Sequence, residues 1–133
     1  MDAAANTHRD GDLAVLLVNL GSPDAPTAPA VRAYLDEFLS DPLVVDWPRW
    51  IWKPILNGII LRTRPPRTAQ AYQRVWTAQG SPLVALTAEQ ACQLSGRLGA
   101  GFDVSWAMRY GKPGIASALA ELRDAGHRRL LVL

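Results

Sequence analysis

The stretch Leu13-Ala-Val-Leu-Leu-Val-Asn-Leu-Gly-Ser-Pro-Asp24 decides how the rest of this 133-residue chain is interpreted. Residues 13–18 are all apolar and include two valines. A short, continuous apolar run is typical of a strand buried on both faces, as in a parallel sheet. Residues 19–24 are rich in turn formers. The stretch therefore predicts a central strand that opens into a loop.

Two further strands are expected over residues 102–108 and from residue 130 to 133, separated from the first by segments with helical periodicity. Strands that alternate with helices predict an α/β fold with a parallel sheet flanked by helices, a Rossmann-like half. Ligands of such sheets bind beyond the carboxyl ends of the strands. The loops 19–24 and 109–112 occupy that position and are the expected site.

Helices are expected between these strands. Val31, Tyr34, Leu35 and Phe38 share one helical face. An irregular helix is expected over residues 51–60, ended by Arg64-Pro65-Pro66, and a separate short one over 68–76. Ser81 and Pro82 have the spacing of an N-cap and first helical residue, for a helix to about Leu98, although Thr87 is an alternative start. Pro113 opens the last expected helix, which Gly126 closes.

Length and composition indicate one globular domain or part of one. Hydrophobic residues make up 49% of the chain and charged residues 20%. Residues 1–12 form a polar tail without the apolar segment of a signal peptide, and no apolar run is long enough to span a membrane. The single Cys92 excludes an internal disulfide and suits a reducing, cytoplasmic location. Because Leu133 ends the sequence within an apolar strand, we expect a fold that is incomplete at its C-terminus.

A local anion site is plausible, whereas the net charge of +2 is too small to indicate nucleic acid. Residues 62–76 contain arginines and no acid. Arg64, Tyr72 and Ser81 form a set of donors for a carboxylate, and Arg109 with Tyr110 follows a strand. No pair of His, Cys or carboxylate side chains has metal-ligand spacing, and His8 and His127 are interpreted as ordinary positions. We interpret Asp36 and Glu37 as a solvated surface.

Several motifs occur in a specific order. They begin with residues 16–24, Leu-Leu-Val-Asn-Leu-Gly-Ser-Pro-Asp. Next come Tyr34-Leu-x-x-Phe-Leu-Ser-Asp41, Val44-Val-Asp46, Arg64-x-Pro66, Tyr72-x-x-Val-Trp76, Gly80-Ser-Pro82 and Ala107-Met-Arg-Tyr-Gly111. With these motifs the chain resembles ferrochelatase over about residues 12–133, and the details resemble the Gram-negative bacterial type.

The resemblance implies two similar α/β halves around a porphyrin cleft, with residues 13–133 as the truncated first half. It implies insertion of Fe²⁺ into protoporphyrin IX to form protohaem in haem biosynthesis, with iron as substrate and no tightly bound cofactor. Residues 47–61 would form an apolar lip where the ring enters and where a membrane is contacted peripherally. The implied substrate-binding residues are Leu20, Gly21, Ser22 and Pro23 in the cleft, Arg64, Tyr72 and Ser81 toward the propionates, and Arg109 and Tyr110 at a strand end.

The family's catalytic His and its partner Glu belong to later segments, and neither His8 nor His127 matches their motif. We therefore expect an active parent protein but an inactive isolated chain, with no catalytic and no metal-binding residue. Two alternatives stay open: a non-catalytic porphyrin- or haem-binding half-domain, and a related chelatase of another tetrapyrrole. A generic nucleotide binder is disfavoured, because the first loop lacks a glycine fingerprint.

Overall fold

The structure, a computed structural model, describes residues 13–133. Its sheet contains β1 (Leu13–Gly21), β2 (Asp103–Tyr110) and β3 (Arg129–Val132) in the order β2-β1-β3. β1 is central and pairs in parallel with both neighbours, so that Val15 lies between Val104 and Leu131. This position explains why the apolar run at the start of β1 is buried. The predicted α/β class with a parallel sheet is confirmed.

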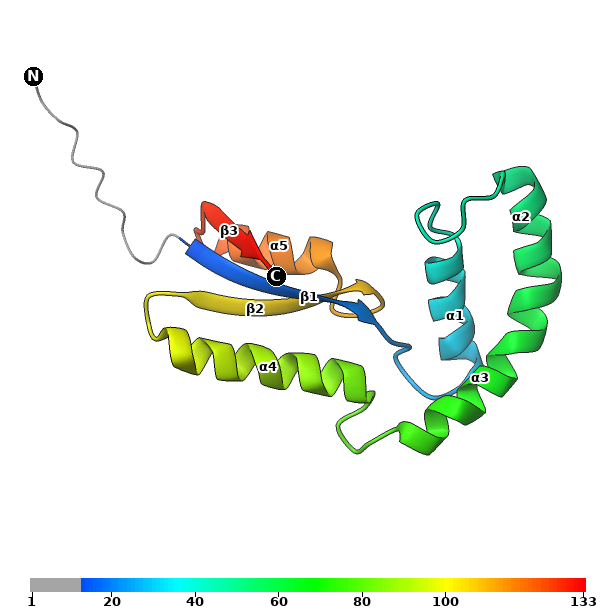
Figure 1. The fold of residues 1–133 in the computed structure, drawn as a ribbon, viewed down its shortest axis with the longest axis horizontal. Coiled ribbons are helices and arrows are strands. Elements are labelled where there is room, and N and C mark those ends of the chain that lie inside the picture. Colours follow the sequence, from blue (N-terminus) through cyan, green and yellow to red (C-terminus); the bar gives the residue numbers. More distant parts are fainter. Residues whose placement is uncertain (1–12) are drawn as a thin grey trace, which may run out of the picture.

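Two helices cover the opposite faces of the sheet, as Figure 1 shows. On one face, α5 (Ile115–Asp124) packs Ala118 and Leu122 into a core with Leu16. On the other face, α4 (Pro82–Leu98) buries Thr87 and Ala91. Ala118 on one face and Ala91 on the other are small side chains, which permit close packing of a helix on a sheet.

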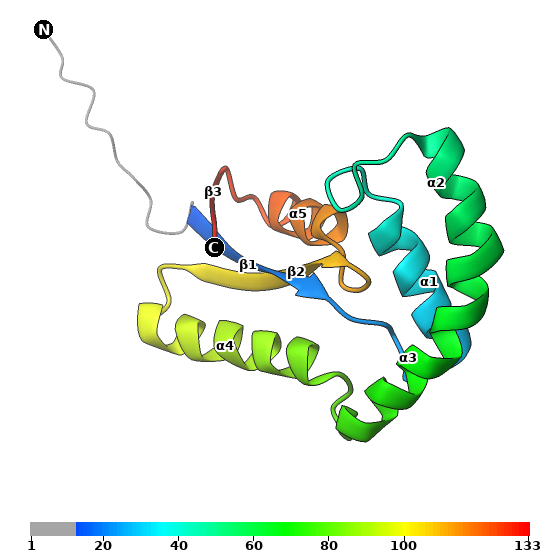
Figure 2. The same cartoon turned by 45° about the vertical axis from the view of Figure 1, so that its right-hand side comes forward.

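The remaining helices form an arm beyond the carboxyl ends of β1 and β2 (Figures 1 and 2). The helical arm, residues 28–75, consists of α1 (Ala28–Leu39), α2 (Arg49–Ile55), the π-helical turn η1 (Leu56–Ile60) and α3 (Leu61–Val75). α1 packs along α3, and Val31, Leu56 and Leu61 are buried within the arm. Residues 22–27 connect the arm to β1, and residues 76–81 connect it to α4.

The prediction that Arg64-Pro65-Pro66 ends a helix is wrong, because α3 continues through both prolines to Val75. Pro65 has no N–H to donate to the carbonyl of Leu61, four residues earlier. That carbonyl instead accepts a 3.3 Å hydrogen bond from Nη1 of Arg32 on α1. Packing and a distant donor thus compensate for the missing helical bond, and the short helix expected over 68–76 is the second half of α3.

Other boundaries differ by a few residues. Backbone pairing with β2 continues to Gly21 opposite Tyr110, so both strands extend into segments predicted as loops. α4 begins at Pro82 with Ser81 as N-cap residue, as predicted, and the alternative start at Thr87 is wrong. α5 begins at Ile115 rather than at Pro113.

Candidate functional site

Two glycines bring the loops after β1 and β2 into contact. Gly21 has a φ of 112°, and a Cβ there would overlap the carbonyl oxygen of Tyr110. Gly111 has a φ of 81°, and its Cβ would lie 2.6 Å from the carbonyl oxygen of Ser22. Both positions therefore need the freedom of glycine, which has no Cβ and tolerates positive φ. The close approach places residues 22–24 beside residues 111–112.

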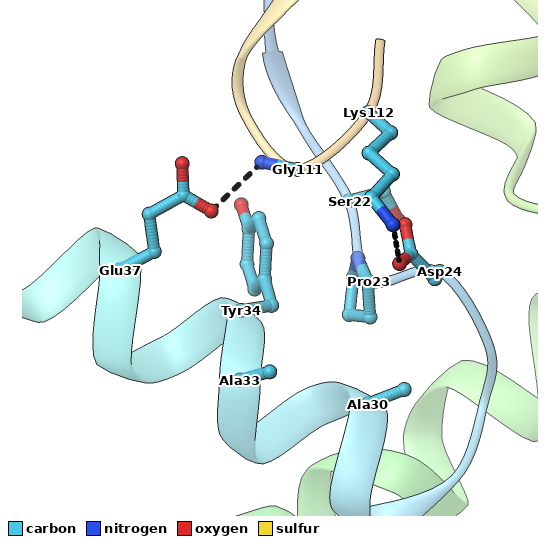
Figure 3. Close-up of a pocket in the computed structure, with 9 residues that line it drawn as sticks. All are labelled: Ser22, Pro23, Asp24, Ala30, Ala33, Tyr34, Glu37, Gly111 and Lys112. Carbon is cyan, nitrogen blue, oxygen red and sulfur yellow. Dashed lines mark hydrogen bonds and ion pairs between the residues drawn. The ribbon is translucent and has the colours of Figure 1, made fainter. Parts of the chain in front are cut away.

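Two hollows flank the contact between these loops. The α1 hollow, about 290 Å³, lies between the loops and α1 (Figure 3); it is lined by Ser22, Pro23, Asp24, Ala30, Ala33, Tyr34, Glu37, Gly111 and Lys112. The α4 hollow, about 170 Å³, faces the start of α4; it is lined by Ser22, Pro23, Asp24, Trp76, Gln79, Gly80, Ser81, Val84 and Lys112. Residues 22–24 and Lys112 border both, and their position agrees with the expected ligand edge of the sheet.

Two polar side chains of the α1 hollow, those of Tyr34 and Glu37, bond the backbone of the loops, and Figure 3 shows the bond between Glu37 and Gly111. The Tyr34 hydroxyl donates a 3.2 Å hydrogen bond to the carbonyl of Gly21. Burial, with smaller contributions from Tyr72, Glu37 and Tyr110, raises the pKa of Tyr34 to about 12. A carboxylate oxygen of Glu37 accepts a 3.1 Å bond from the amide of Gly111. Asp36 and Glu37 are both exposed, as predicted, and Glu37 has this backbone partner in addition.

Ser22 is the buried polar residue between the two hollows. It is only 3% exposed, and its Oγ is buried without a hydrogen-bond partner. A buried hydroxyl that makes no bond is unfavourable, since it has lost its contacts with water. Above it, Lys112 Nζ lies 3.6 Å from a carboxylate oxygen of Asp24. An unused donor and a loosely paired cation therefore meet at this edge.

Arg109 and Tyr110, predicted as site residues, bind the segment that follows α1. Asp41 accepts a 2.8 Å bond from Arg109 Nη2 and a 2.6 Å bond from the Tyr110 hydroxyl, and its other oxygen accepts the amide of Leu43. These hydrogen bonds, Tyr110 first and Arg109 second, lower the pKa of Asp41 to about 2. The same contacts raise the pKa of Arg109. We call this cluster the Asp41 tie.

The other predicted residues lie at different depths. Ser81 is buried at the start of α4 and borders the α4 hollow, so it meets Ser22 and Pro23 there. Tyr72, half-buried on α3, makes an edge-to-face contact with Trp76, which lines the same hollow. Leu20 is exposed at the end of β1. Arg64 is exposed on α3 and borders neither hollow.

Sequence reasoning missed Glu37, Gln79 and the acceptor role of Asp41. Asp41 and Tyr110 are separated by 69 positions, so no local pattern links them. Gln79 precedes the motif Gly80-Ser81-Pro82 directly, and this position next to a motif is the one sequence feature that could have indicated its place at the α4 hollow.

Of the residues that the structure describes, the one histidine, His127, lies far from the edge where the two hollows are found. His127 Nε2 lies 2.9 Å from Asp103, the first residue of β2, roughly 20 Å along the strand from Tyr110. His8 lies outside the described residues. Within residues 13–133, no group of three or more His, Cys, Asp or Glu side chains is arranged to hold a metal ion.

A family model described as Ferrochelatase matches residues 12–133. The chain belongs to the ferrochelatase family. It is 57% identical over 123 residues to a ferrochelatase of Polaromonas sp., which covers 90% of this chain and 34% of the relative. It is also 57% identical over 121 residues to a coproporphyrin III ferrochelatase of Symbiobacterium thermophilum, covering 90% of this chain and 38% of the relative. The chain thus spans about a third of the length of these members of the ferrochelatase family.

Proposed function

We propose that this chain supplies the porphyrin-binding part of a ferrochelatase that inserts Fe²⁺ into protoporphyrin IX to form protohaem. The observation that carries the proposal is the match to the ferrochelatase family over residues 12–133. The site supports it, because Ser22, Pro23 and Ser81 meet at the carboxyl ends of β1 and β2, where an α/β sheet binds its ligand. The assignment of residues 13–133 as the first half of a cleft is part of this proposal.

In this function the chain binds and orients the ring. Metal insertion requires a bent porphyrin and the loss of two pyrrole N–H protons, for which a neutral imidazole is a suitable acceptor near pH 7. His127 is bonded to Asp103 at the opposite end of β2 and does not serve this role. Holding the ring in a bent shape favours the transition state over flat substrate. We therefore propose that the chain by itself binds porphyrin without inserting iron.

Titration with protoporphyrin IX tests the binding. The chain contains five tryptophans, among them Trp76 in the α4 hollow, and we expect saturable quenching of their fluorescence. Pro23→Trp should weaken binding because it fills the wall shared by both hollows, whereas Arg97→Gln, on the exposed surface of α4, should not. Absence of saturable binding would contradict the proposal. Iron insertion above the uncatalysed rate would contradict the inactivity of the chain alone.

The same experiment with other ligands separates the alternatives. Binding of porphyrin that persists without any metal insertion by the whole protein would favour the non-catalytic half-domain. Since one relative is named as a coproporphyrin III ferrochelatase, coproporphyrin III belongs in the titration as the nearest competing tetrapyrrole. Tighter binding of coproporphyrin III than of protoporphyrin IX would assign the chain to that other substrate.

A second proposed role is peripheral membrane contact through residues 47–61. Trp50 is 79% exposed and Ile59 is 59% exposed, while Arg49 and Lys53 supply positive charge beside them. Exposed aromatic and aliphatic side chains next to cations suit the interface of an anionic bilayer. None of the described helices is long and apolar enough to cross a membrane. This role agrees with the predicted cytoplasmic, membrane-associated location.

Co-sedimentation with phosphatidylglycerol-containing vesicles tests the membrane contact. The double variant Trp50→Ser, Ile59→Ser should reduce the fraction bound to vesicles, because serine offers much less apolar surface for burial in the bilayer than these two exposed side chains. Leu119→Ser is the matched control, because Leu119 is an exposed apolar residue that lies on α5, outside residues 47–61. Equal binding of the wild type and the double variant would contradict the proposal.

A further inference from the structure

A further hollow lies at the opposite edge of the sheet, where the strands begin. It measures about 130 Å³, lies between the end of α5 and the start of β3, and is called the α5 hollow. Pockets for drug-sized ligands measure about 300–1,000 Å³, so the α5 hollow suits one small group rather than a macrocycle. Its polar border consists of Arg123, His127, Arg128 and Arg129, and its apolar border includes Leu119 and Leu122.

The turn that ends α5 fixes the position of this border. Gly126 has a φ of 95°, which glycine tolerates. Its amide donates a 2.9 Å hydrogen bond to the carbonyl of Arg123, and the amide of His127 donates a 3.1 Å bond to the carbonyl of Leu122. These two bonds form a Schellman motif, which satisfies carbonyls at the end of a helix. The turn thereby lessens the repulsion that the negative end of a helix exerts on an anion.

Positive charge dominates the border of the α5 hollow. Of the residues that the structure describes, no aspartate or glutamate borders it, whereas Asp24 borders both the α1 and the α4 hollow. Asp103 lies 2.9 Å from Nε2 of His127, and Asp124 accepts a 2.9 Å bond from Arg123. The side chains of Arg123 and Asp124 are 76% and 69% exposed, so water screens their pair and it contributes little. Arg123 can therefore bond a ligand at low cost.

Two residues of the border have unused bonding capacity. Arg128 is exposed and takes part in none of the ion pairs found within residues 13–133. The side chain of His127 is only 13% exposed, and its Nδ1 is buried without a hydrogen-bond partner among the described residues. Buried polar groups are normally bonded, so this nitrogen indicates a missing partner.

A phosphate monoester matches both kinds of group. Its oxygens accept hydrogen bonds from guanidinium groups, whose planar fork fits phosphate geometry. Its second pKa is about 6, so at this pH part of it carries a hydroxyl hydrogen that can be donated to an unprotonated Nδ1. Carboxylates, with pKa values of about 4, have largely lost that hydrogen. Among small anions, the phosphate monoester therefore suits the arginines and the imidazole together.

We propose that the α5 hollow binds the phosphate group of a small phosphate monoester, held by Arg123 and Arg128 and bonded by the ring of His127. The apolar part of the ester lies against Leu119 and Leu122. This site is separate from the ligand edge, because the length of β2 places its two ends roughly 20 Å apart. The inference does not rest on the proposed function, so a failure of porphyrin binding leaves it unaffected.

Phenyl phosphate and phenyl sulfate, each titrated into the full chain at pH 6, test the site. The two esters share a ring and a tetrahedral anion, but only the phosphate retains a hydrogen at this pH. Phenyl phosphate should shift the amide NMR signals of Gly126, His127 and Arg128 in a saturable manner. It should bind about three- to tenfold more tightly than phenyl sulfate, the range of one additional hydrogen bond. Equal affinities would overturn the choice of ligand, and shifts confined to other parts of the chain would overturn the site.

Substitutions in the border test the individual contacts. Arg128→Gln should weaken binding of phenyl phosphate about three- to tenfold, because a hydrogen bond to a charged group is lost. Arg67→Gln is the matched control, since Arg67 is an exposed arginine on α3 and does not border the α5 hollow. Equal affinities of these two variants would overturn the site. His127→Phe keeps a ring without nitrogen and should abolish the preference for phosphate over sulfate, and a preference that persists would overturn the role of His127.

Discussion

The carboxylate of Asp41 accepts a 2.6 Å hydrogen bond from the hydroxyl of Tyr110 and so joins the helical arm to the end of β2. This bond is the last of four contacts that residues at helical spacing, from Tyr34 to Asp41, make with the ends of β1 and β2. Tyr34 bonds Gly21, Glu37 bonds Gly111, and Phe38 makes an edge-to-face contact with Tyr110. One side of α1 and its continuation therefore holds the arm beside the loops that form both hollows.

Replacing Asp41 by Asn should change the pH dependence of stability. Because hydrogen bonds lower the pKa of Asp41 from 3.8 to about 2, its ionised form stabilises the folded chain above the unfolded-state value. That contribution is lost as the pH falls from 3.8 toward 2. Chemical denaturation at several pH values should show a wild-type advantage at pH 6 that shrinks toward pH 2. A difference that is independent of pH would contradict the role of the charge.

Replacing Gly21 by Ala should destabilise the chain by more than about 3 kcal/mol, because positive φ and a backbone overlap are combined. Gly96→Ala is the control, since Gly96 lies within α4 with open space around its Cα. That substitution should stabilise the chain by about 0.5–1 kcal/mol through helix propensity. Urea denaturation measures both, and similar effects of the two substitutions would refute the close approach.

Replacing Tyr34 by Phe removes the bond to the Gly21 carbonyl and should cost about 0.5–1.5 kcal/mol. Since the pKa of Tyr34 is raised to about 12, its neutral form stabilises the fold below pH 10, and this contribution disappears between pH 10 and about 12. An ultraviolet titration should therefore lose one late-ionising tyrosine in the variant. An unchanged titration curve would show that Tyr34 is not the group concerned.

Replacing Arg64 by Ala should weaken binding of protoporphyrin IX by about 1–3 kcal/mol if its guanidinium bonds a propionate. Arg64 is exposed and lies outside both hollows, so the predicted contact requires a ligand that extends along α3. Fluorescence titration compares it with Arg97→Ala on α4. Equal affinities for the two variants would remove Arg64 from the site.

The bond between Arg32 and Leu61 predicts coupling with Pro65. Arg32→Met should cost about 0.5–1.5 kcal/mol, because the Leu61 carbonyl loses its donor. In a Pro65→Ala background the new amide at position 65 satisfies that carbonyl, so the same change should cost less. A double-mutant cycle measures the coupling, and strictly additive effects would contradict this explanation of the helix.

Part of the site could be predicted from the sequence. The apolar run at the start of β1 and the turn formers after it place Ser22 and Pro23 at the ligand edge, because parallel strands end at one edge of a sheet. Ser81 follows from its local signature as the N-cap residue of α4. The Asp41 tie and the joining of Ser22, Ser81 and Lys112 in one hollow could not be predicted, since their partners are distant in the chain.

By itself, the sequence determined the α/β class, the central strand and the start of α4, because apolar periodicity and capping act within a few residues. Only the tertiary structure decided that α3 passes through Pro65 and Pro66. The carbonyl of Leu61 is satisfied by Arg32, 29 positions away, and that compensation exists only when α1 and α3 are packed together. The same reason applies to Asp41, whose role arises from the fold that brings β2 to it.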